Sequence, residues 1–174
     1  ESNNHNKKLH ILSAPSGYGR EIFEVADELK SNNYKKYAYV NWHLLDLNKK
    51  LFSEIEKKFN KNNHNLKYWK GDALNHKIFT KMGKFDLIMS TGFVDFLPDD
   101  KAVKFYRLVY KTLKSKGKFV TSGMKKHRLS DYLLRNIAEL HTFYRTEEQL
   151  KDLATSAGFK SIRTYQEPNK ILTM

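Results

Sequence analysis

The sequence predicts an α/β fold in which helices cover a mostly parallel, doubly wound β-sheet. The first observation is that two kinds of segment alternate along the chain: short apolar runs, and longer runs with apolar residues at helical spacing. Another is that no stretch rich in Pro, Gly and Ser divides residues 9–174, so a single domain is expected there. Residues 1–8 are polar, and we expect a disordered or linker-like stretch.

The strands are expected where apolar, aromatic and β-branched residues cluster between turn residues. The first run stops at Pro15, the fourth stops at Thr91-Gly92, and a turn over 114–117 leads into the fifth. Residues 167–169 separate two short runs at the end of the chain. The seven strands expected are 9–14, 37–45, 65–69, 85–90, 118–121, 161–165 and 171–174.

The helices are expected where apolar residues recur every three or four positions. Asp99 and Asp100 open one of these runs, where acidic side chains suit the positive end of the helix dipole. Thr146 is followed by acidic residues and is expected to be the N-cap of the last helix. The helices expected are 20–29, 49–59, 99–110, 129–140 and 147–157.

Composition excludes several classes of protein. The chain of 174 residues has no cysteine, so it has no disulfide, thiolate zinc site or cysteine nucleophile. No apolar run reaches the roughly 20 residues that span a bilayer, and a cytoplasmic location is expected. The histidines show no metal-ligand spacing with acidic residues, so no metal site is expected. The net charge of +13 is spread along the chain and fits an acidic lipid, an RNA or a lysine-rich solvated surface equally well.

Ligands of doubly wound sheets bind beyond the carboxyl ends of the strands, so the loops there are the candidate site. The loop after the first strand contains Gly17 and Gly19, which indicate either close approach of a ligand or tight packing of strand on helix. Asp46 ends the second strand, where an acid accepts hydrogen bonds from a ribose or else caps the next helix. Asp72 and Ala73 follow the third strand, where they meet an adenine edge or form a plain turn.

Together these motifs resemble those of the class I S-adenosylmethionine-dependent methyltransferases over nearly the whole chain. Phe85-Asp86-Leu87-Ile88 and Ala157-Gly158-Phe159 are similar to further motifs of that family. The resemblance implies a Rossmann-like three-layer fold, a seven-stranded sheet with an antiparallel C-terminal hairpin, and S-adenosylmethionine as the cofactor. The chain begins almost at its first strand, so we expect N-terminal capping helices to be absent from it. The implied cofactor-binding residues are Ser13, Pro15, Ser16, Gly17, Gly19, Arg20, Asp46, Asp72, Ala73, Ser90, Thr91 and Gly92.

Two positions depart from the family pattern. The family usually has an acid where Ser13 stands and a glycine where Pro15 stands. The acid normally helps to fix the methionine end of the cofactor. Glu21 or another group then takes its place, or the affinity for the cofactor is reduced, as in a catalytically weak member of the family.

A narrower resemblance covers parts of the second half. Residues 90–97, 121–124 and 139–146 are similar to a bacterial methyltransferase group that makes hydroxy-fatty-acid methyl esters. Its usual tryptophan is replaced by His141 and its asparagine by Gly123, so the substrate is expected to differ. This implies a small-molecule or lipid-like acceptor that carries an acidic group.

The candidate catalytic residues are Tyr144, Arg145 and His141. A base for an alcohol or amine acceptor could be His43, His127, His141 or Tyr144. Arg145 could bind an acidic acceptor through two hydrogen bonds, or it could form an ion pair with Glu147 or Glu148. An RNA methyltransferase or RNA-binding protein that uses the basic surface is the competing interpretation. The oligomeric state is left open.

Overall fold

The computed structural model describes residues 8–32, 40–59, 65–166 and 172–173. The chain divides into two compact units. The first unit contains Glu1–Met89 and Thr112–Lys118, and the second contains Ser90–Lys111 and Phe119–Met174. The two units are described separately.

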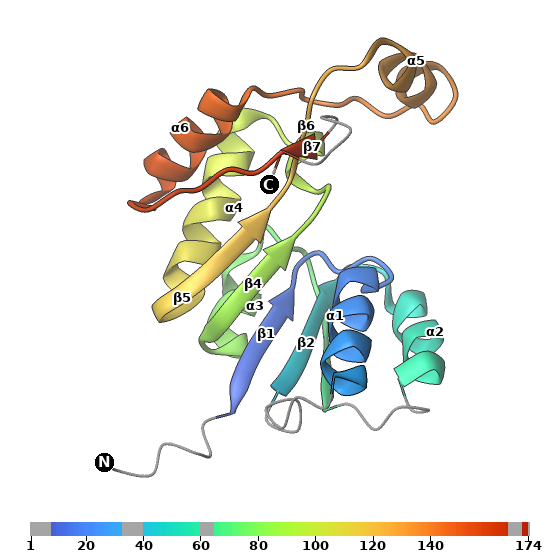
Figure 1. Cartoon of the computed structure of the whole chain (residues 1–174), viewed down its shortest axis with the longest axis vertical. Helices are drawn as coiled ribbons and strands as arrows, with labels where there is room; N and C mark the ends of the chain where they lie inside the picture. The colour runs from blue at the N-terminus through green and yellow to red at the C-terminus, as the bar shows by residue number, and fades with distance from the viewer. Residues whose placement is uncertain (1–7, 33–39, 60–64, 167–171, 174) are drawn as a thin grey trace. The chain divides into compact units, whose positions relative to one another are not determined.

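Five of the described strands form a sheet with the order β3-β2-β1-β4-β5 (Figure 1), and the first unit contains this sheet except Ser90 of β4 and residues 119–121 of β5. The strands are β1 (Leu9–Ser13), β2 (Val40–Asp46), β3 (Leu66–Lys70), β4 (Phe85–Ser90) and β5 (Leu113–Thr121). The ladders between β1 and β2, β1 and β4, and β2 and β3 are parallel, which confirms the predicted α/β class. Because Ser13 pairs with Leu44, and Asp46 pairs with Lys70, the carboxyl ends of β1, β2 and β3 lie at one edge.

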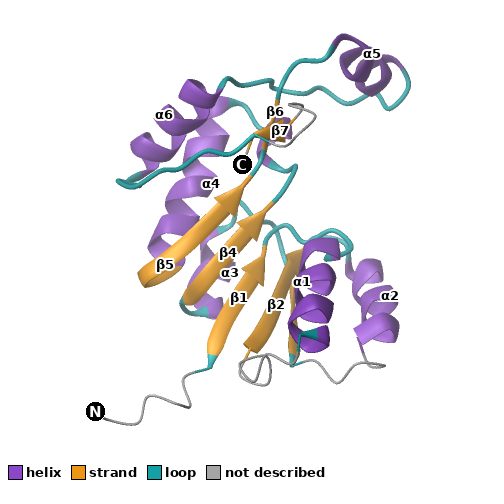
Figure 2. Ribbon diagram, in the orientation of Figure 1, coloured by secondary structure: helices purple, strands orange, loops and turns teal. Residues whose placement is uncertain are grey.

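One face of this sheet is apolar and is covered by α1 (Arg20–Ser31) and α2 (Lys49–Phe59) (Figure 2). Alternate strand residues point to this face, as the two-residue period of a strand requires. They pack against the buried faces of the two helices. The resulting core contains Ile11, Ile22, Ala26, Val40, Trp42, Leu44, Phe52, Ile55 and Met89.

The strand residues of opposite parity include buried Leu12, Leu45 and Ile88, and also a set of polar residues that form a network. The indole N–H of Trp69 donates to Nδ1 of His43 over 3.1 Å, and Nε2 of His43 lies 3.2 Å from Nδ1 of His10. Burial, with smaller effects from His10 and Lys67, lowers the pKa of His43 to about 4, so its ring is neutral at pH 7. Neutral His43, which accepts at Nδ1, therefore donates from Nε2 to His10.

Asp86 extends this network to the other side of β1. Its Oδ2 accepts hydrogen bonds from the backbone N–H of His10 over 2.8 Å and from the ammonium of Lys114 over 2.6 Å. Burial opposes ionisation of Asp86, but these two donors outweigh it and lower the pKa of the carboxyl. The network therefore links residues of β1, β2, β3, β4 and β5.

A short helix, α3 (His76–Met82), was not predicted. Asn75 is its N-cap and accepts the backbone N–H of Lys77 over 3.0 Å. Only Phe79 and Met82 of this helix are buried, so its apolar periodicity is too short to stand out. The cap residue followed by these two side chains is the signal that was available.

The second unit contains η2 (Val94–Phe96), α4 (Asp99–Thr112), α5 (Arg128–Asn136) and α6 (Glu147–Ala157). The predicted cap of α6 is confirmed, because Thr146 accepts the N–H of Gln149 and the Gln149 side chain accepts the N–H of Thr146. The α4 and α6 helices lie side by side (Figure 1), and the guanidinium of Arg107 donates to the carbonyl of Ser156 over 3.2 Å.

The prediction of one seven-stranded sheet with a C-terminal hairpin is wrong. Residues 161–165 are not a strand, and β7 (Leu172–Thr173) instead pairs antiparallel with β6 (Gly123–Met124). In residues 161–165 the apolar side chains, Ile162 and Tyr165, are three positions apart and would point to opposite faces of a strand. Residues 37–39, 167–171 and 174 of the predicted strands lie outside the described residues.

Two other boundaries differ from those predicted by more than two residues. The expected turn over 114–117 is part of β5, which begins at Leu113 and contains Lys116 with a φ of 64°. The α5 helix ends at Asn136 instead of at residue 140. None of the residues of α5 is buried, so no core contact extends this helix over its last apolar residues.

Candidate functional site

The loop between β1 and α1 is bound to the ends of the neighbouring strands. The backbone N–H of Ala14 donates to the carbonyl of Met89 over 2.9 Å, and that of Ser16 donates to the carbonyl of Leu45 over 2.8 Å. The Ala14–Pro15 peptide bond is cis. The loop thus continues the order of the sheet beyond the ends of the strands.

The two glycines of this loop have different surroundings. Gly19 is the N-cap of α1 with a φ of 63°, and a Cβ atom there would lie 3.3 Å from Cδ2 of Leu44. Gly17 has a φ of 49°, and a Cβ atom there would meet nothing within 4 Å. Packing of strand on helix therefore explains Gly19, as the alternative interpretation had it, but it does not explain Gly17.

Asp46, the last residue of β2, accepts hydrogen bonds from the segments that follow β1, β2 and β3. Its Oδ2 accepts the backbone N–H of Gly17, and its Oδ1 accepts that of Asn48, each over 2.9 Å. Its carbonyl accepts the backbone N–H of Gly71, which follows β3, over 3.0 Å. Asn48 is the residue whose side chain accepts the N–H of Lys50, so the alternative role of Asp46 as the helix cap is wrong.

The Gly71-Asp72-Ala73 turn lies beyond the end of β3. Oδ1 of Asp72 accepts the backbone N–H of Leu74 over 2.8 Å, which is a local turn contact. The Asp72 side chain is exposed and Ala73 is buried. A local turn therefore accounts for one oxygen of Asp72 and leaves its other oxygen accessible.

Ser13 departs from the family pattern, and the structure places a carboxylate beside it. The hydroxyl of Ser13, at the carboxyl end of β1, is fully buried and donates to Oε1 of Glu21. Glu21 lies in the first turn of α1 and is half-buried. It lines a pocket of about 630 Å³ together with Ser16, Tyr18, Arg20, Phe23, Glu24 and Asp27.

Ser90 is the last residue of β4, as predicted, and Thr91 and Gly92 follow it; all three belong to the second unit. Ser90 is fully buried, Thr91 is exposed, and Gly92 has a φ of 74°. The backbone N–H of Gly92 donates to the hydroxyl of Ser122, at the end of β5, over 2.9 Å. Ser122 was not among the predicted site residues.

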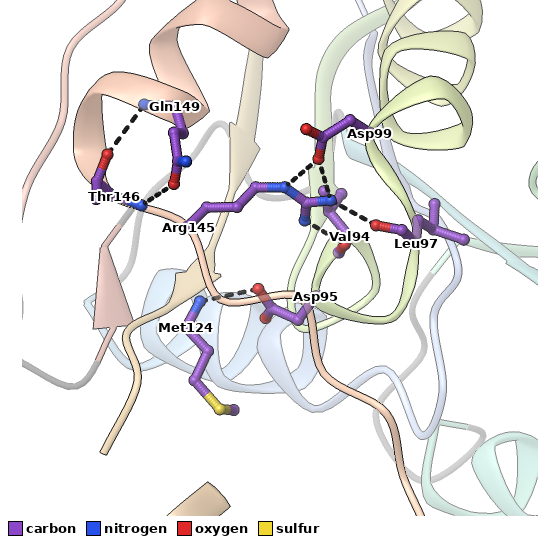
Figure 3. A network of polar contacts seen from close by, with 8 residues as sticks. All are labelled: Val94, Asp95, Leu97, Asp99, Met124, Arg145, Thr146 and Gln149. Atoms are coloured by element: carbon purple, nitrogen blue, oxygen red, sulfur yellow. Dashed lines mark hydrogen bonds and ion pairs between the residues drawn. The ribbon is translucent and has the colours of Figure 1, made fainter. Parts of the chain in front are cut away.

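The Arg145 clamp, which is Arg145 with its partners Asp99, Val94 and Leu97, holds a turn of the second unit together (Figure 3). The Arg145 guanidinium donates to Oδ1 of Asp99 from Nε over 3.0 Å and from Nη2 over 2.8 Å. It also donates to the carbonyl of Val94 over 2.8 Å and to that of Leu97 over 2.5 Å. Arg145 is only 5% exposed, so we withdraw the hypothesis that it binds an acidic acceptor. The expected ion pair with Glu147 or Glu148 is also wrong.

Asp95 lies beside this clamp and was not predicted as a site residue. Its Oδ1 accepts the backbone N–H of Met124 over 2.8 Å, and its carbonyl accepts that of Phe143 over 2.7 Å (Figure 3). Burial raises the pKa of the Asp95 carboxyl, against the effects of Met124 and Arg145. Asp95 therefore connects η2 with β6 and with the segment before α6.

The other two predicted catalytic residues lie in that same segment. His141 is exposed, and Tyr144 is half-buried. Burial and the nearby carboxylate of Asp131 raise the pKa of Tyr144, so its hydroxyl is protonated at neutral pH. Tyr144 is thus better suited to donate a hydrogen bond than to act as a base.

The chain was compared with known proteins. A family model described as a methyltransferase domain matches residues 11–117. No curated protein sequence matches the chain. In the described part of the chain, no helix is long and apolar enough to cross a membrane, and no group of three or more histidine and acidic side chains is placed to bind a metal.

Several solved structures share the fold. One is the CMeT domain of the citrinin polyketide synthase, with a TM-score of 0.77, 16% identity, and coverage of 98% of this chain and 46% of that chain. Another is an O-methyltransferase family protein from Burkholderia thailandensis, with a TM-score of 0.71, 12% identity, and coverage of 95% and 49%. A third is human N-acetylserotonin methyltransferase in complex with S-adenosylmethionine, with a TM-score of 0.68, 17% identity, and coverage of 94% and 45%. The chain thus spans about half the length of each of these proteins.

Proposed function

The chain belongs to the methyltransferase domain family, and from this we propose that it binds S-adenosylmethionine and transfers its methyl group. The observation that carries this proposal is the convergence of the strand ends on Asp46. Its carboxylate bonds the loop after β1, and its carbonyl bonds the turn after β3. Two loops that a nucleoside would contact are thereby joined to the acid that would accept its ribose hydroxyls.

The residues at this edge fit such a ligand. Each carboxylate oxygen of Asp46 accepts one backbone N–H and retains a lone pair for a further hydrogen bond. The absence of a side chain at Gly17 leaves its Cα facing open space, so a ligand can approach the backbone closely. Asp72 has an accessible oxygen for the base, and Ala73 is small. The proposed cofactor-binding residues of the first unit remain Ser13, Pro15, Ser16, Gly17, Gly19, Arg20, Asp46, Asp72 and Ala73. Ser90, Thr91 and Gly92 of the second unit remain a separate proposal.

S-adenosylmethionine supplies the reactive methyl group when it is bound. The protein has to orient the donor and the acceptor and to shield them from water. His141 is our candidate for the group that accepts a proton from an acceptor, and Tyr144 for a group that donates a hydrogen bond to it. The guanidinium of Arg145 is bonded to Asp99, Val94 and Leu97 and is not available to a substrate. The residue that favoured an acidic acceptor therefore no longer supports one.

For the acceptor we propose a small molecule or a lipid-like molecule that is methylated on oxygen. Support comes from the named neighbours, which include an O-methyltransferase family protein and N-acetylserotonin methyltransferase. The RNA alternative has less support. Tyr68 packs on Phe52 in the core with ring centroids 4.9 Å apart, and Trp69 bonds His43, so neither ring is free to stack on a base.

Isothermal titration calorimetry with S-adenosylmethionine and S-adenosylhomocysteine tests the cofactor. We expect saturable binding to the 174-residue chain, weakened at least about tenfold by Asp46→Ala, because the ribose loses a charged acceptor. Asp100→Ala is the control, since Asp100 is an exposed acid in the first turn of α4. Absence of binding at millimolar ligand, or equal affinity of the Asp46→Ala protein, would falsify the proposal. Release of S-adenosylhomocysteine over a panel of hydroxy fatty acids, phenols and tRNA then identifies the acceptor.

A further inference from the structure

The carboxylate of Glu21, a residue of α1, lies at the carboxyl end of β1. Ser13 is the last residue of β1, and its buried hydroxyl donates to the carboxylate of Glu21. Glu21 is the second residue of α1, so its side chain is directed back from the first turn of the helix to the strand end. The Ser13 contact fixes the carboxylate in this position.

Glu21 differs from the other two carboxylates described at this edge. Asp46 accepts the backbone N–H groups of Gly17 and Asn48, and Asp72 accepts that of Leu74. For Glu21 the described part of the chain provides one hydroxyl donor and no backbone donor. An ionised carboxylate has about four acceptor positions, so most of those of Glu21 are available to a ligand.

The pocket beside α1 gives a ligand access to this carboxylate. Glu21 lines it together with Ser16 of the glycine loop and with Tyr18 and Arg20. The guanidinium of Arg20 lies 3.7 Å from the carboxylate of Glu24, one turn further along the exposed side of α1. Arg20 thus pairs with Glu24, and no described cation forms an ion pair with Glu21.

We infer that Glu21 binds the α-ammonium group of the cofactor and that Ser13 positions the Glu21 carboxylate for this contact. The inference rests on the function proposed above, because S-adenosylmethionine carries a cationic amino group at its methionine end. A carboxylate that is partly buried and free of other cations suits an ammonium through charge-assisted hydrogen bonds. The contact selects ligands that have the amino-acid end over ligands that have only the adenosyl end.

The test compares two ligands that differ in this end. S-adenosylhomocysteine has the amino acid, whereas 5′-methylthioadenosine has the adenosyl group and no ammonium. We expect Glu21→Gln to weaken S-adenosylhomocysteine about tenfold and to leave 5′-methylthioadenosine within about twofold. Ser13→Ala should weaken S-adenosylhomocysteine about threefold, because it removes the hydrogen bond that positions the Glu21 carboxylate but leaves the carboxylate itself. Dissociation constants from calorimetry are the readout, and circular dichroism shows that the variants fold.

The matched control is Glu28→Gln, which removes an exposed carboxylate from the same helix but outside the pocket that Glu21 lines. It should bind both ligands like the unchanged chain. Equal affinity of the Glu21→Gln protein for S-adenosylhomocysteine would overturn the inference, and so would equal weakening of both ligands, since Glu21 would then only organise the loop. If the unchanged chain binds neither ligand, the proposed function itself fails. If it binds both and only Glu21→Gln is without effect, the proposed function stands and the inference alone fails.

Discussion

The carboxyl ends of β1–β3 and the clamp around Arg145 both consist of polar side chains in loops that follow strands, yet they differ in how completely those side chains are bonded. At the strand ends, Asp46 and Glu21 keep acceptor positions that the protein does not fill. In the clamp, Arg145 is buried and donates four hydrogen bonds to Asp99, Val94 and Leu97. A polar loop residue of the first kind can bind a ligand, whereas one of the second kind holds the fold.

The difference shows why residue type alone does not identify a site. An arginine before an N-cap threonine has the right chemistry for an acidic acceptor, and an aspartate at a strand end has the right chemistry for a helix cap. The structure excludes both interpretations. Arg145 is buried and bonded to Asp99, and the N-cap of α2 is Asn48 and not Asp46. Unfilled acceptor positions next to open space are therefore the better criterion for a binding site.

The largest effect on stability is expected from Arg145→Met. The change removes the donor of the Leu97 carbonyl and one of the two donors of the Val94 carbonyl, which keeps the N–H of Leu97, in a buried turn. We expect a cost of about 3 kcal/mol in the free energy of unfolding. Urea denaturation measures it. Asp99→Asn is the control and should cost less than about 1 kcal/mol, because the Asp99 side chain is 76% exposed. A stable Arg145→Met protein would mean that Arg145 is free for another role.

A comparable effect is expected from pH through His43, a buried residue of β2 whose side chain belongs to the polar network of the first unit. The ordinary pKa of 6.5 applies in the unfolded chain and about 4 in the folded one, so protons bind preferentially to the unfolded state between these values. His43 therefore contributes fully above pH 6.5, and its contribution is lost as the pH falls to about 4. The loss amounts to about 3 kcal/mol.

Urea denaturation between pH 7.5 and pH 4 measures this loss. The lowered pKa of His10 acts in the same direction, whereas that of Asp86 acts only below its ordinary value of 3.8. The His43→Gln protein should have a flatter profile, because glutamine does not titrate. A profile as steep as that of the unchanged chain would show that His43 is not the group responsible.

The sequence predicts the fold best where burial decides it. The observed bounds of β4 are the predicted ones, since four of its residues (Phe85, Leu87, Ile88 and Met89) are apolar and clear turn signals flank the strand. It predicts α3 and the last strands poorly, because α3 has two buried residues and residues 161–165 have no two-residue period. Short elements of this kind depend on tertiary contacts more than on pattern.

The candidate site follows the same rule. Asp46 and the glycine loop were predicted because strand ends can be located from the apolar runs before them. The bond from Gly17 to Asp46 spans 29 residues and that from Arg145 to Asp99 spans 46, and no local pattern encodes either pairing. The Ser13–Glu21 contact spans only 8 residues, so the acid one turn into the helix was a usable signal.

The smallest effects are expected from the two loop glycines, which test the difference between packing and binding within one loop. Gly19→Ala should cost about 2 kcal/mol of unfolding free energy, because its φ is 63° and the new Cβ atom would press on buried Leu44. Gly17→Ala should cost about 1 kcal/mol, because its φ of 49° is also left-handed but the space around it is open. Binding of S-adenosylhomocysteine should show the opposite order, with the greater loss for Gly17→Ala, since that methyl group would occupy the space left for the ligand. If Gly17→Ala bound as tightly as the unchanged chain, the open space at Gly17 would not be where the cofactor lies.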